Sequence, residues 1–145
     1  MVTLFDDLLN SYFFDEQVAL ATRFDLPLII HSVQATEDVA DLLKSYSKSR
    51  GVIHAYSGTL REAEILMKMN FLFGFSNNLS NPHAYKLHDI VKFLPLESIL
   101  IETDDHKNSD ELIQVAERVA RIKKITVDQA IEQCDQNARK LFNLA

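Results

Sequence analysis

Residues 26–32 read LPLIIHS and residues 51–58 read GVIHAYSG. Each stretch is a short apolar run that stops at a histidine, His31 in the first and His54 in the second. Apolar runs of this length are typical of strands buried on both faces, as in a parallel sheet. In repeated strand–helix units, active sites are built at the carboxyl ends of the strands. Two histidines at such ends, in successive units, therefore indicate a functional site.

The rest of the chain alternates between strand-like and helix-like segments. Four apolar runs predict strands at residues 28–31, 52–55, 71–75 and 98–103. Apolar residues at helical spacing predict a helix before the first strand, one after each strand and an extra one at the end. Thr36 is the expected N-cap of one helix, and Pro82 the expected first residue of another. The alternation predicts an α/β fold with parallel strands, and residues 1–13 form an unassigned start.

Composition limits the class of protein. The chain has 145 residues, 47% of them hydrophobic, which fits one globular domain over residues 1–145. The net charge of −6 argues against a preformed basic surface for nucleic acid. Bound divalent ions can nevertheless supply positive charge at a phosphate. No apolar stretch approaches the roughly 20 residues that span a bilayer, and the acidic start is unlike a signal peptide. We therefore expect a cytoplasmic protein that does not enter membranes.

Three residues form the candidate site. His31, His54 and Asp104 follow strands whose carboxyl ends would share one rim, and Glu102 and Thr103 directly precede Asp104. Two imidazoles and a carboxylate suit zinc, manganese or a similar divalent ion, and three protein ligands leave a position for water. Each residue also has a purely structural interpretation. A strand-end histidine can simply be hydrogen-bonded, and Asp104 can cap a helix. Glu102 can be the buried partner of a basic residue.

Other polar residues carry weaker signals. His83, His88 and His106 lie in polar segments, which favours solvent exposure. Arg118, Arg121, Lys123 and Lys124 form a basic cluster that is typical of a solvated helix face and helix end.

The ordered motifs resemble those of the TatD family, which contains metal-dependent hydrolases and deoxyribonucleases of amidohydrolase-like barrels. They are Phe14-x-x-Gln17, the two histidine runs, FGFS at residues 73–76, LIETD ending at Asp104, and NARKLF at residues 137–142. The resemblance extends from about Phe14 to the end of the chain. No single motif is specific, but their order and spacing together are.

The resemblance implies a (β/α)8 barrel with a two-metal site at its carboxyl rim. By this resemblance His31 and His54 bind one divalent metal ion (Mg, Mn or Zn). Asp104 is then the catalytic carboxylate that binds the other ion or its water, and Glu102 and Thr103 support Asp104. The implied reaction is metal-dependent hydrolysis of phosphodiester bonds, with DNA as the substrate.

The chain corresponds to the carboxyl-terminal half of such a barrel, about four strand–helix units plus extra terminal helices. A full barrel needs roughly 250 residues. The His-x-His pair and the bridging glutamate that the family implies are not found in the sequence. We therefore expect a truncated enzyme that is weak or inactive alone. Open sheet edges favour association with a second copy or with a complementary amino-terminal half. The alternatives are a non-catalytic remnant or interaction module and, less favoured, a small-molecule amidohydrolase.

Overall fold

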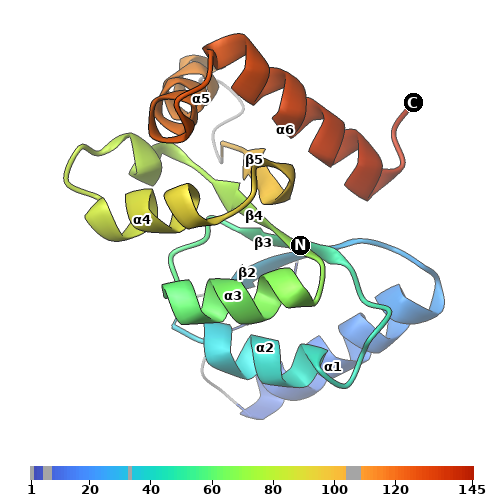
Figure 1. Ribbon diagram of the computed structural model, residues 1–145. Coiled ribbons are helices and arrows are strands. Elements are labelled where there is room, and N and C mark those ends of the chain that lie inside the picture. The colour runs from blue at the N-terminus through green and yellow to red at the C-terminus, as the bar shows by residue number, and fades with distance from the viewer. Residues whose placement is uncertain (1, 5–7, 33, 104–108) are drawn as a thin grey trace. The chain divides into compact units, whose positions relative to one another are not determined.

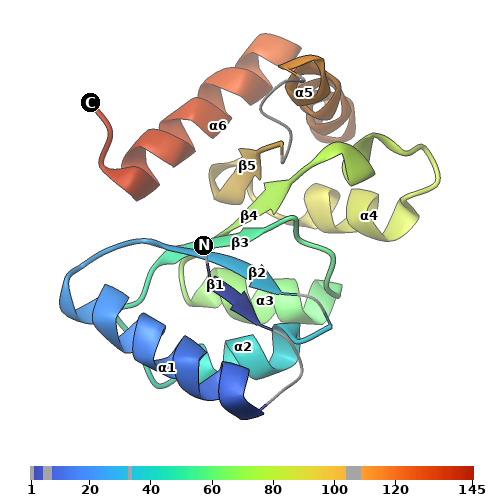
Figure 2. The same cartoon turned by 180° about the vertical axis from the view of Figure 1, so that it is seen from behind.

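A computed structural model describes residues 2–4, 8–32, 34–103 and 109–145 (Figures 1 and 2). Over these ranges the chain forms five strands and six α-helices, with two short 3-10 helices. Contacts group the chain into two compact units, Met1–Leu72 and Phe73–Ala145. The single domain expected over residues 1–145 remains a prediction.

The first unit contains three parallel strands and three helices. Its elements are β1 (Val2–Leu4), α1 (Leu8–Arg23), β2 (Leu28–Ser32), α2 (Thr36–Leu43), β3 (Gly51–His54) and α3 (Leu60–Lys68). Strand β2 pairs in parallel with both β1 and β3. Both views place α1, α2 and α3 on one side of these strands. In β2 burial alternates, with Leu28 and Ile30 buried and Ile29 36% exposed, so the expectation that this strand is buried on both faces is wrong.

Local signals in the sequence position these elements. Thr59 and Glu62 form a capping box that starts α3: the Thr59 hydroxyl accepts from Glu62 N, and the Glu62 carboxylate accepts from Thr59 N. Asn70, two residues after the end of α3, adopts the left-handed conformation with φ 62°. Ile30 and Ile53 are fully buried, which anchors β2 and β3 in the core. The capping box satisfies backbone N–H groups at the start of α3 that have no partner within the helix. Burial of the two isoleucines removes apolar surface from water.

The second unit begins within β4 (Phe71–Phe75). Its other elements are η1 (Asn77–Ser80), α4 (Tyr85–Phe93), η2 (Leu96–Ser98), β5 (Ile99–Ile101), α5 (Ser109–Lys123) and α6 (Val127–Phe142). Strands β4 and β5 are parallel, with Phe75 opposite Ile101. A second capping box, between Thr126 and Gln129, starts α6.

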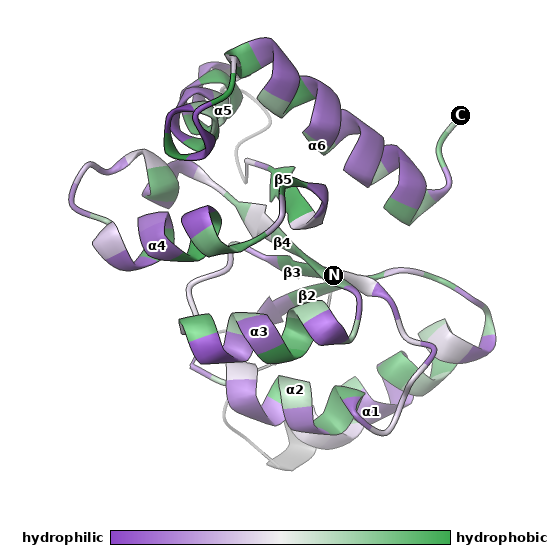
Figure 3. Cartoon of the chain, viewed as in Figure 1, coloured by the Kyte–Doolittle hydropathy of each residue, from purple (hydrophilic) through white to green (hydrophobic). Residues whose placement is uncertain are grey.

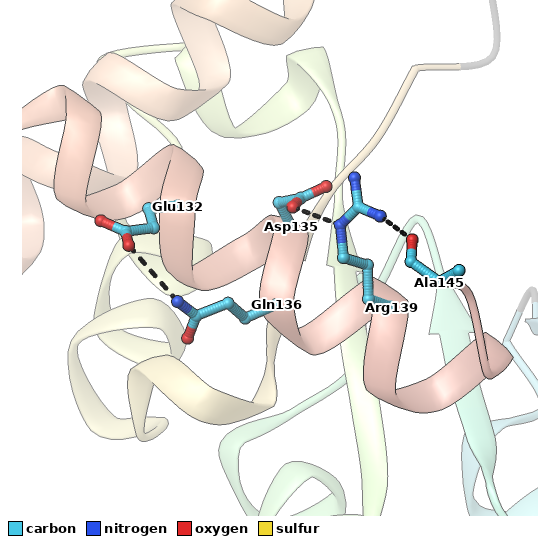
Figure 4. Close-up of polar contacts among 5 residues, drawn as sticks. All are labelled: Glu132, Asp135, Gln136, Arg139 and Ala145. Atoms are coloured by element: carbon cyan, nitrogen blue, oxygen red, sulfur yellow. Dashed lines mark hydrogen bonds and ion pairs between the residues drawn. The ribbon is translucent and has the colours of Figure 1, made fainter.

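Helix α6 has distinct buried and exposed faces. On the buried face, the Asn137 amide donates to Leu96 O at 2.9 Å and to Ile99 O at 2.8 Å. The exposed face is largely hydrophilic in Figure 3. There Arg139 pairs with Asp135 at 2.7 Å and also donates to Ala145 O (Figure 4). The buried amide ties α6 to η2 and β5, whereas exposed pairs of this kind contribute little to stability.

The structure confirms the parallel α/β architecture and corrects three details. The start that the sequence left unassigned contains β1, and α1 already begins at Leu8, so the described chain has five strands rather than four. The interpretation of Thr36 as an N-cap is wrong. Ala35 occupies the cap, and the Thr36 hydroxyl lies 3.2 Å from the Ser32 hydroxyl instead.

The expected helix start at Pro82 is also wrong. The Asn81 side chain accepts from His83 N at 2.9 Å, and Ala84 N donates to Asn81 O. These bonds form a turn, so α4 begins only at Tyr85. An asparagine whose side chain bonds the backbone two residues later competes with the helix that the following proline could have started.

Candidate functional site

His31 and His54 are direct neighbours at the carboxyl ends of β2 and β3. The parallel register places His31 opposite His54. Their ring centroids lie 5.4 Å apart, and the ring planes are inclined by 41°. Both side chains are half-buried. The structure thus brings together two of the three site residues expected from the sequence.

The spacing of the two rings fits joint binding of one metal ion. An imidazole nitrogen binds zinc at about 2.0–2.1 Å, which puts two tetrahedrally arranged ring centroids about 5.2 Å apart. The observed 5.4 Å agrees with that distance. Within the described residues, the buried Nδ1 atom of His31 has no hydrogen-bond partner. A buried ring nitrogen without a partner is costly, and metal coordination is one way to satisfy it.

The chain turns sharply directly after His54. Ala55 adopts the left-handed conformation with φ 48°, which is uncommon for a residue with a side chain. Tyr56 is buried, and its hydroxyl donates to Thr59 O at 2.6 Å. Burial, with the nearby Glu62 carboxylate, raises the pKa of Tyr56 above its ordinary value. The phenol is therefore a neutral structural donor that fixes the loop following His54.

Glu102 lies against a glycine in the second unit. Glu102 N donates to Phe75 O, which extends the pairing of β4 with β5 by one residue. A Cβ atom on Gly74 would lie 2.5 Å from Glu102 Cδ and 2.7 Å from Oε1. The absence of a side chain at Gly74 thus makes room for the Glu102 carboxylate. The neighbouring Thr103 hydroxyl donates to Glu111 at 3.0 Å, so both residues before Asp104 are held in place.

Asp104, the third expected ligand, lies outside the described residues, and so does His106. Among the residues that are described, no three His, Cys, Asp or Glu side chains gather as metal ligands would. The assignment of Asp104 as ligand and catalytic carboxylate, and of Glu102 and Thr103 as its support, stays a prediction.

The weaker sequence signals divide between confirmation and correction. His83 is exposed as expected. His88 is half-buried, and its Nε2 atom lies 3.1 Å from Leu79 O, so the expectation of solvent exposure is wrong for this residue. Arg118 and Lys123 are not simply solvated: Arg118 donates to Ser80 O, and Lys123 donates to Lys92 O and Leu94 O. These cations tie α5 to the ends of η1 and α4.

Two glycines make close contacts that the sequence did not predict, Gly74 with Glu102 and Gly51 with the strand that leads to His31. Gly74 interrupts the apolar run 71–75, and Gly51 opens the run that ends at His54. An isolated glycine in a strand pattern signals a close backbone approach, and that signal could have identified both.

The chain is similar to known proteins over most of its length. The family model for TatD related DNase matches residues 9–143. The chain is 33% identical over 144 residues to YabD of Bacillus subtilis, an uncharacterized metal-dependent hydrolase, covering 90% of this chain and 56% of that protein. It is 31% identical over 135 residues to a human protein named deoxyribonuclease TATDN3, covering 87% of this chain and 48% of the relative.

A solved relative shows the same fold. YjjV of Escherichia coli, named an uncharacterized metal-dependent hydrolase, is 34% identical over 139 residues, covering 92% of this chain and 54% of YjjV. The crystal structure of this TatD homologue matches 100% of this chain and 63% of the crystallised chain with a TM-score of 0.88, at 27% identity. The chain spans about half the length of the curated relatives it matches.

No helix among the described residues is both long and apolar enough to cross a membrane.

The parallel strands, the two histidines at their ends and the match over residues 9–143 agree with one another. The chain belongs to the TatD family, whose members include metal-dependent hydrolases.

Proposed function

We propose that this chain supplies part of the active site of a metal-dependent phosphodiesterase of the deoxyribonuclease type. His31 and His54 bind one divalent ion, and Asp104 contributes the catalytic carboxylate. The observation that carries the proposal is the pairing of His31 with His54 at 5.4 Å, with the Nδ1 atom of His31 buried. The DNA substrate follows from the family description and from the name of the human relative.

The two histidines act as neutral ligands. Each would offer one ring nitrogen to the ion, and the strand pairing places the two residues side by side. When bound, the divalent ion lowers the pKa of a coordinated water and stabilises negative charge on phosphoryl oxygens. Mg, Mn and Zn ions all remain candidates, because the donor set of imidazole and carboxylate accepts each of them.

Asp104 accepts the proton of the attacking water, or binds the ion that holds it. Two contacts in the second unit support this role. The Thr103 hydroxyl donates to the Glu111 carboxylate, and the Glu102 side chain packs against Gly74. Each of the two residues before Asp104 therefore has a contact that holds it in place. Glu102 and Thr103 are thus positioning residues that act through Asp104.

We further propose that hydrolysis by this chain alone is weak. The His-x-His pair and bridging glutamate implied by the family do not occur in its sequence. A complementary amino-terminal half would supply them. The cytoplasm is the proposed compartment, because a net charge of −6 is ordinary for a cytosolic protein.

The test is hydrolysis of single-stranded DNA and of bis(p-nitrophenyl) phosphate with added Mg²⁺, Mn²⁺ or Zn²⁺. The variants are His31→Ala, His54→Ala and Asp104→Asn, with His83→Ala as the control because His83 is an exposed histidine outside the proposed site. We expect slow, metal-dependent turnover that all three site variants abolish and His83→Ala retains.

Two results would contradict the proposal. Metal-dependent turnover that survives all three substitutions would place the chemistry elsewhere. No turnover, together with metal binding that ignores His31 and His54, would favour a non-catalytic interaction module.

A further inference from the structure

Helix α1 carries large apolar side chains on two adjacent faces, one buried and one exposed, about a quarter of a turn apart. On the inner face Phe14 and Val18 are fully buried in the first unit. On the outer face Phe13, Leu20 and Phe24 are 54%, 52% and 62% exposed. Figure 2 shows α1 along its length, beside α2, with one side turned away from the strands. Grouped exposed apolar residues of this size mark interaction surfaces.

The exposed residues follow the spacing of a helix–helix seam. Phe13, Gln17, Leu20 and Phe24, here called the outer stripe, are separated by four, three and four positions. Phe24 N donates to Leu20 O, so the helical geometry continues to the end of the stripe. A spacing of alternating threes and fours is that of the a and d positions in a coiled coil.

The neighbouring helix α2 shows that such a stripe is not a general feature of this unit. Its exposed side chains are charged: Glu37, Asp38 and Asp41, with Lys44 directly after the helix. A charged outer face is what a helix that faces only water requires. The outer stripe of α1 therefore needs a separate explanation.

Charged residues beside the stripe identify its orientation. Glu16 and Arg23 are exposed, lie seven residues apart and so flank the stripe on the same side. When two copies of α1 pack antiparallel, this side of one helix faces the same side of the other. Glu16 of each copy then lies opposite Arg23 of the second copy, twice per pair. In a parallel pair these two residues would face the other flank, where Phe14 and Ala21 are buried.

We propose that the outer stripe is a two-fold symmetric interface at which two copies of this chain pair through antiparallel α1 helices. Phe13 of one copy packs against Phe24 of the second, and Gln17 packs against Leu20, by the same symmetry. The self-complementary sequence satisfies the requirement of an isologous contact, in which one patch binds its own copy. Arg23, which now stacks on the Phe24 ring at 5.5 Å, is already placed at the edge of the apolar seam.

The test is sedimentation equilibrium of the full chain over a concentration series, with charge-exchange variants. We expect a reversible dimer for the parent chain. Glu16→Arg and Arg23→Glu should each weaken dimerisation about tenfold, because attractive pairs become repulsive ones. The double variant Glu16→Arg/Arg23→Glu should restore the parent affinity. Ile131→Asp, an exposed apolar position on α6, is the matched control for Leu20→Asp, which should abolish the dimer.

A parent chain that stays monomeric at every concentration would overturn the proposal and favour a helix of another protein as the occupant. A dimer whose affinity the double variant fails to restore would also overturn it, because the antiparallel geometry requires rescue. Far-ultraviolet circular dichroism of each variant establishes that the exchanges, all at exposed positions, leave the fold intact.

Discussion

Leu28 lies opposite Gly51 at the start of β2 and β3, and this contact sets the register that ends with His31 opposite His54. A Cβ atom at Gly51 would lie 2.9 Å from Leu28 Cβ and 3.0 Å from Leu28 C. The approach of the two strands therefore depends on the missing side chain. We therefore expect a change at this end of the strand pair to alter the positions of the histidines at the other end.

Gly51→Ala should accordingly disturb both stability and metal binding. Relief of the clash requires the strands to separate, which we expect to lower the free energy of unfolding by about 1–3 kcal/mol. The separation should also weaken metal binding at the histidine pair. Urea unfolding and metal titration measure the two effects, with Ser47→Ala in the exposed preceding loop as the control. Unchanged stability and metal affinity in Gly51→Ala would show that the close approach does not fix the register.

Asn137→Asp should be strongly destabilising. The substitution removes the two N–H donors that reach Leu96 O and Ile99 O and places a carboxylate against both carbonyls. The loss should be about 2–4 kcal/mol, since buried acceptors lose partners and a buried charge is left unpaired. Asn78→Asp, the same exchange at an exposed position, should change the free energy of unfolding by less than about 0.5 kcal/mol. Equal losses in the two variants would refute a specific role of the buried amide.

Lys124→Gly should stabilise the protein. Lys124 follows α5 in the left-handed conformation with φ 58°, and Ile125 N donates to Ala120 O across it. This is a helix end at which glycine is preferred because it has no Cβ penalty. We expect a gain of about 0.5–1 kcal/mol in the free energy of unfolding. Lys124→Ala removes the charge without the conformational relief, so thermal unfolding of this variant should show no such gain.

Stability should fall in alkali. Burial raises the pKa of the Cys134 thiol from 9.0 to about 12. Because the folded state favours the neutral thiol, this contribution is complete below pH 9.0 and is lost between pH 9.0 and about 12. Burial raises the pKa of Tyr56 as well, with the same sign, whereas desolvation lowers the pKa of Lys123, which acts in the opposite direction.

Cys134→Ala isolates the thiol. Its free energy of unfolding, measured by urea titration in steps upward from pH 9.0, should decline less steeply than that of the parent, by up to about 1.4 kcal/mol per pH unit. The variant is expected to start from a lower stability because a buried side chain is shortened. Parallel pH profiles for the two proteins would exclude the thiol as a source of the alkaline loss.

The sequence predicted the parallel strands and the histidine pair because these features rest on local patterns. Both runs that end in His31 and His54 are uninterrupted and apolar, so their strand conformation and parallel direction could be inferred, although Ile29 in the first run is exposed. Strand β1 has three residues, too few to show any period. The start of α4 depended on the Asn81 turn, in which a side-chain bond overrides the preference of Pro82 for a helix start.

Contacts between residues far apart in the chain could not be predicted from the sequence. Lys123 and Arg118 read as solvated cations because their acceptors are backbone carbonyls far away in the chain. The space that Gly74 leaves for Glu102 likewise appears only once β4 and β5 pair. The outer stripe of α1 was missed for a related reason: its residues interleave with the buried ones, so only exposure separates the two faces.

The central claim is that His31 and His54 bind one divalent ion together. Isothermal titration calorimetry with Zn²⁺ and with Mn²⁺ tests this claim directly. The parent chain is compared with His31→Ala, His54→Ala and the double variant. We predict one site per chain, lost equally in all three variants, since either histidine alone is an incomplete site. Binding that persists in the double variant, or that responds to only one histidine, would contradict a shared metal site.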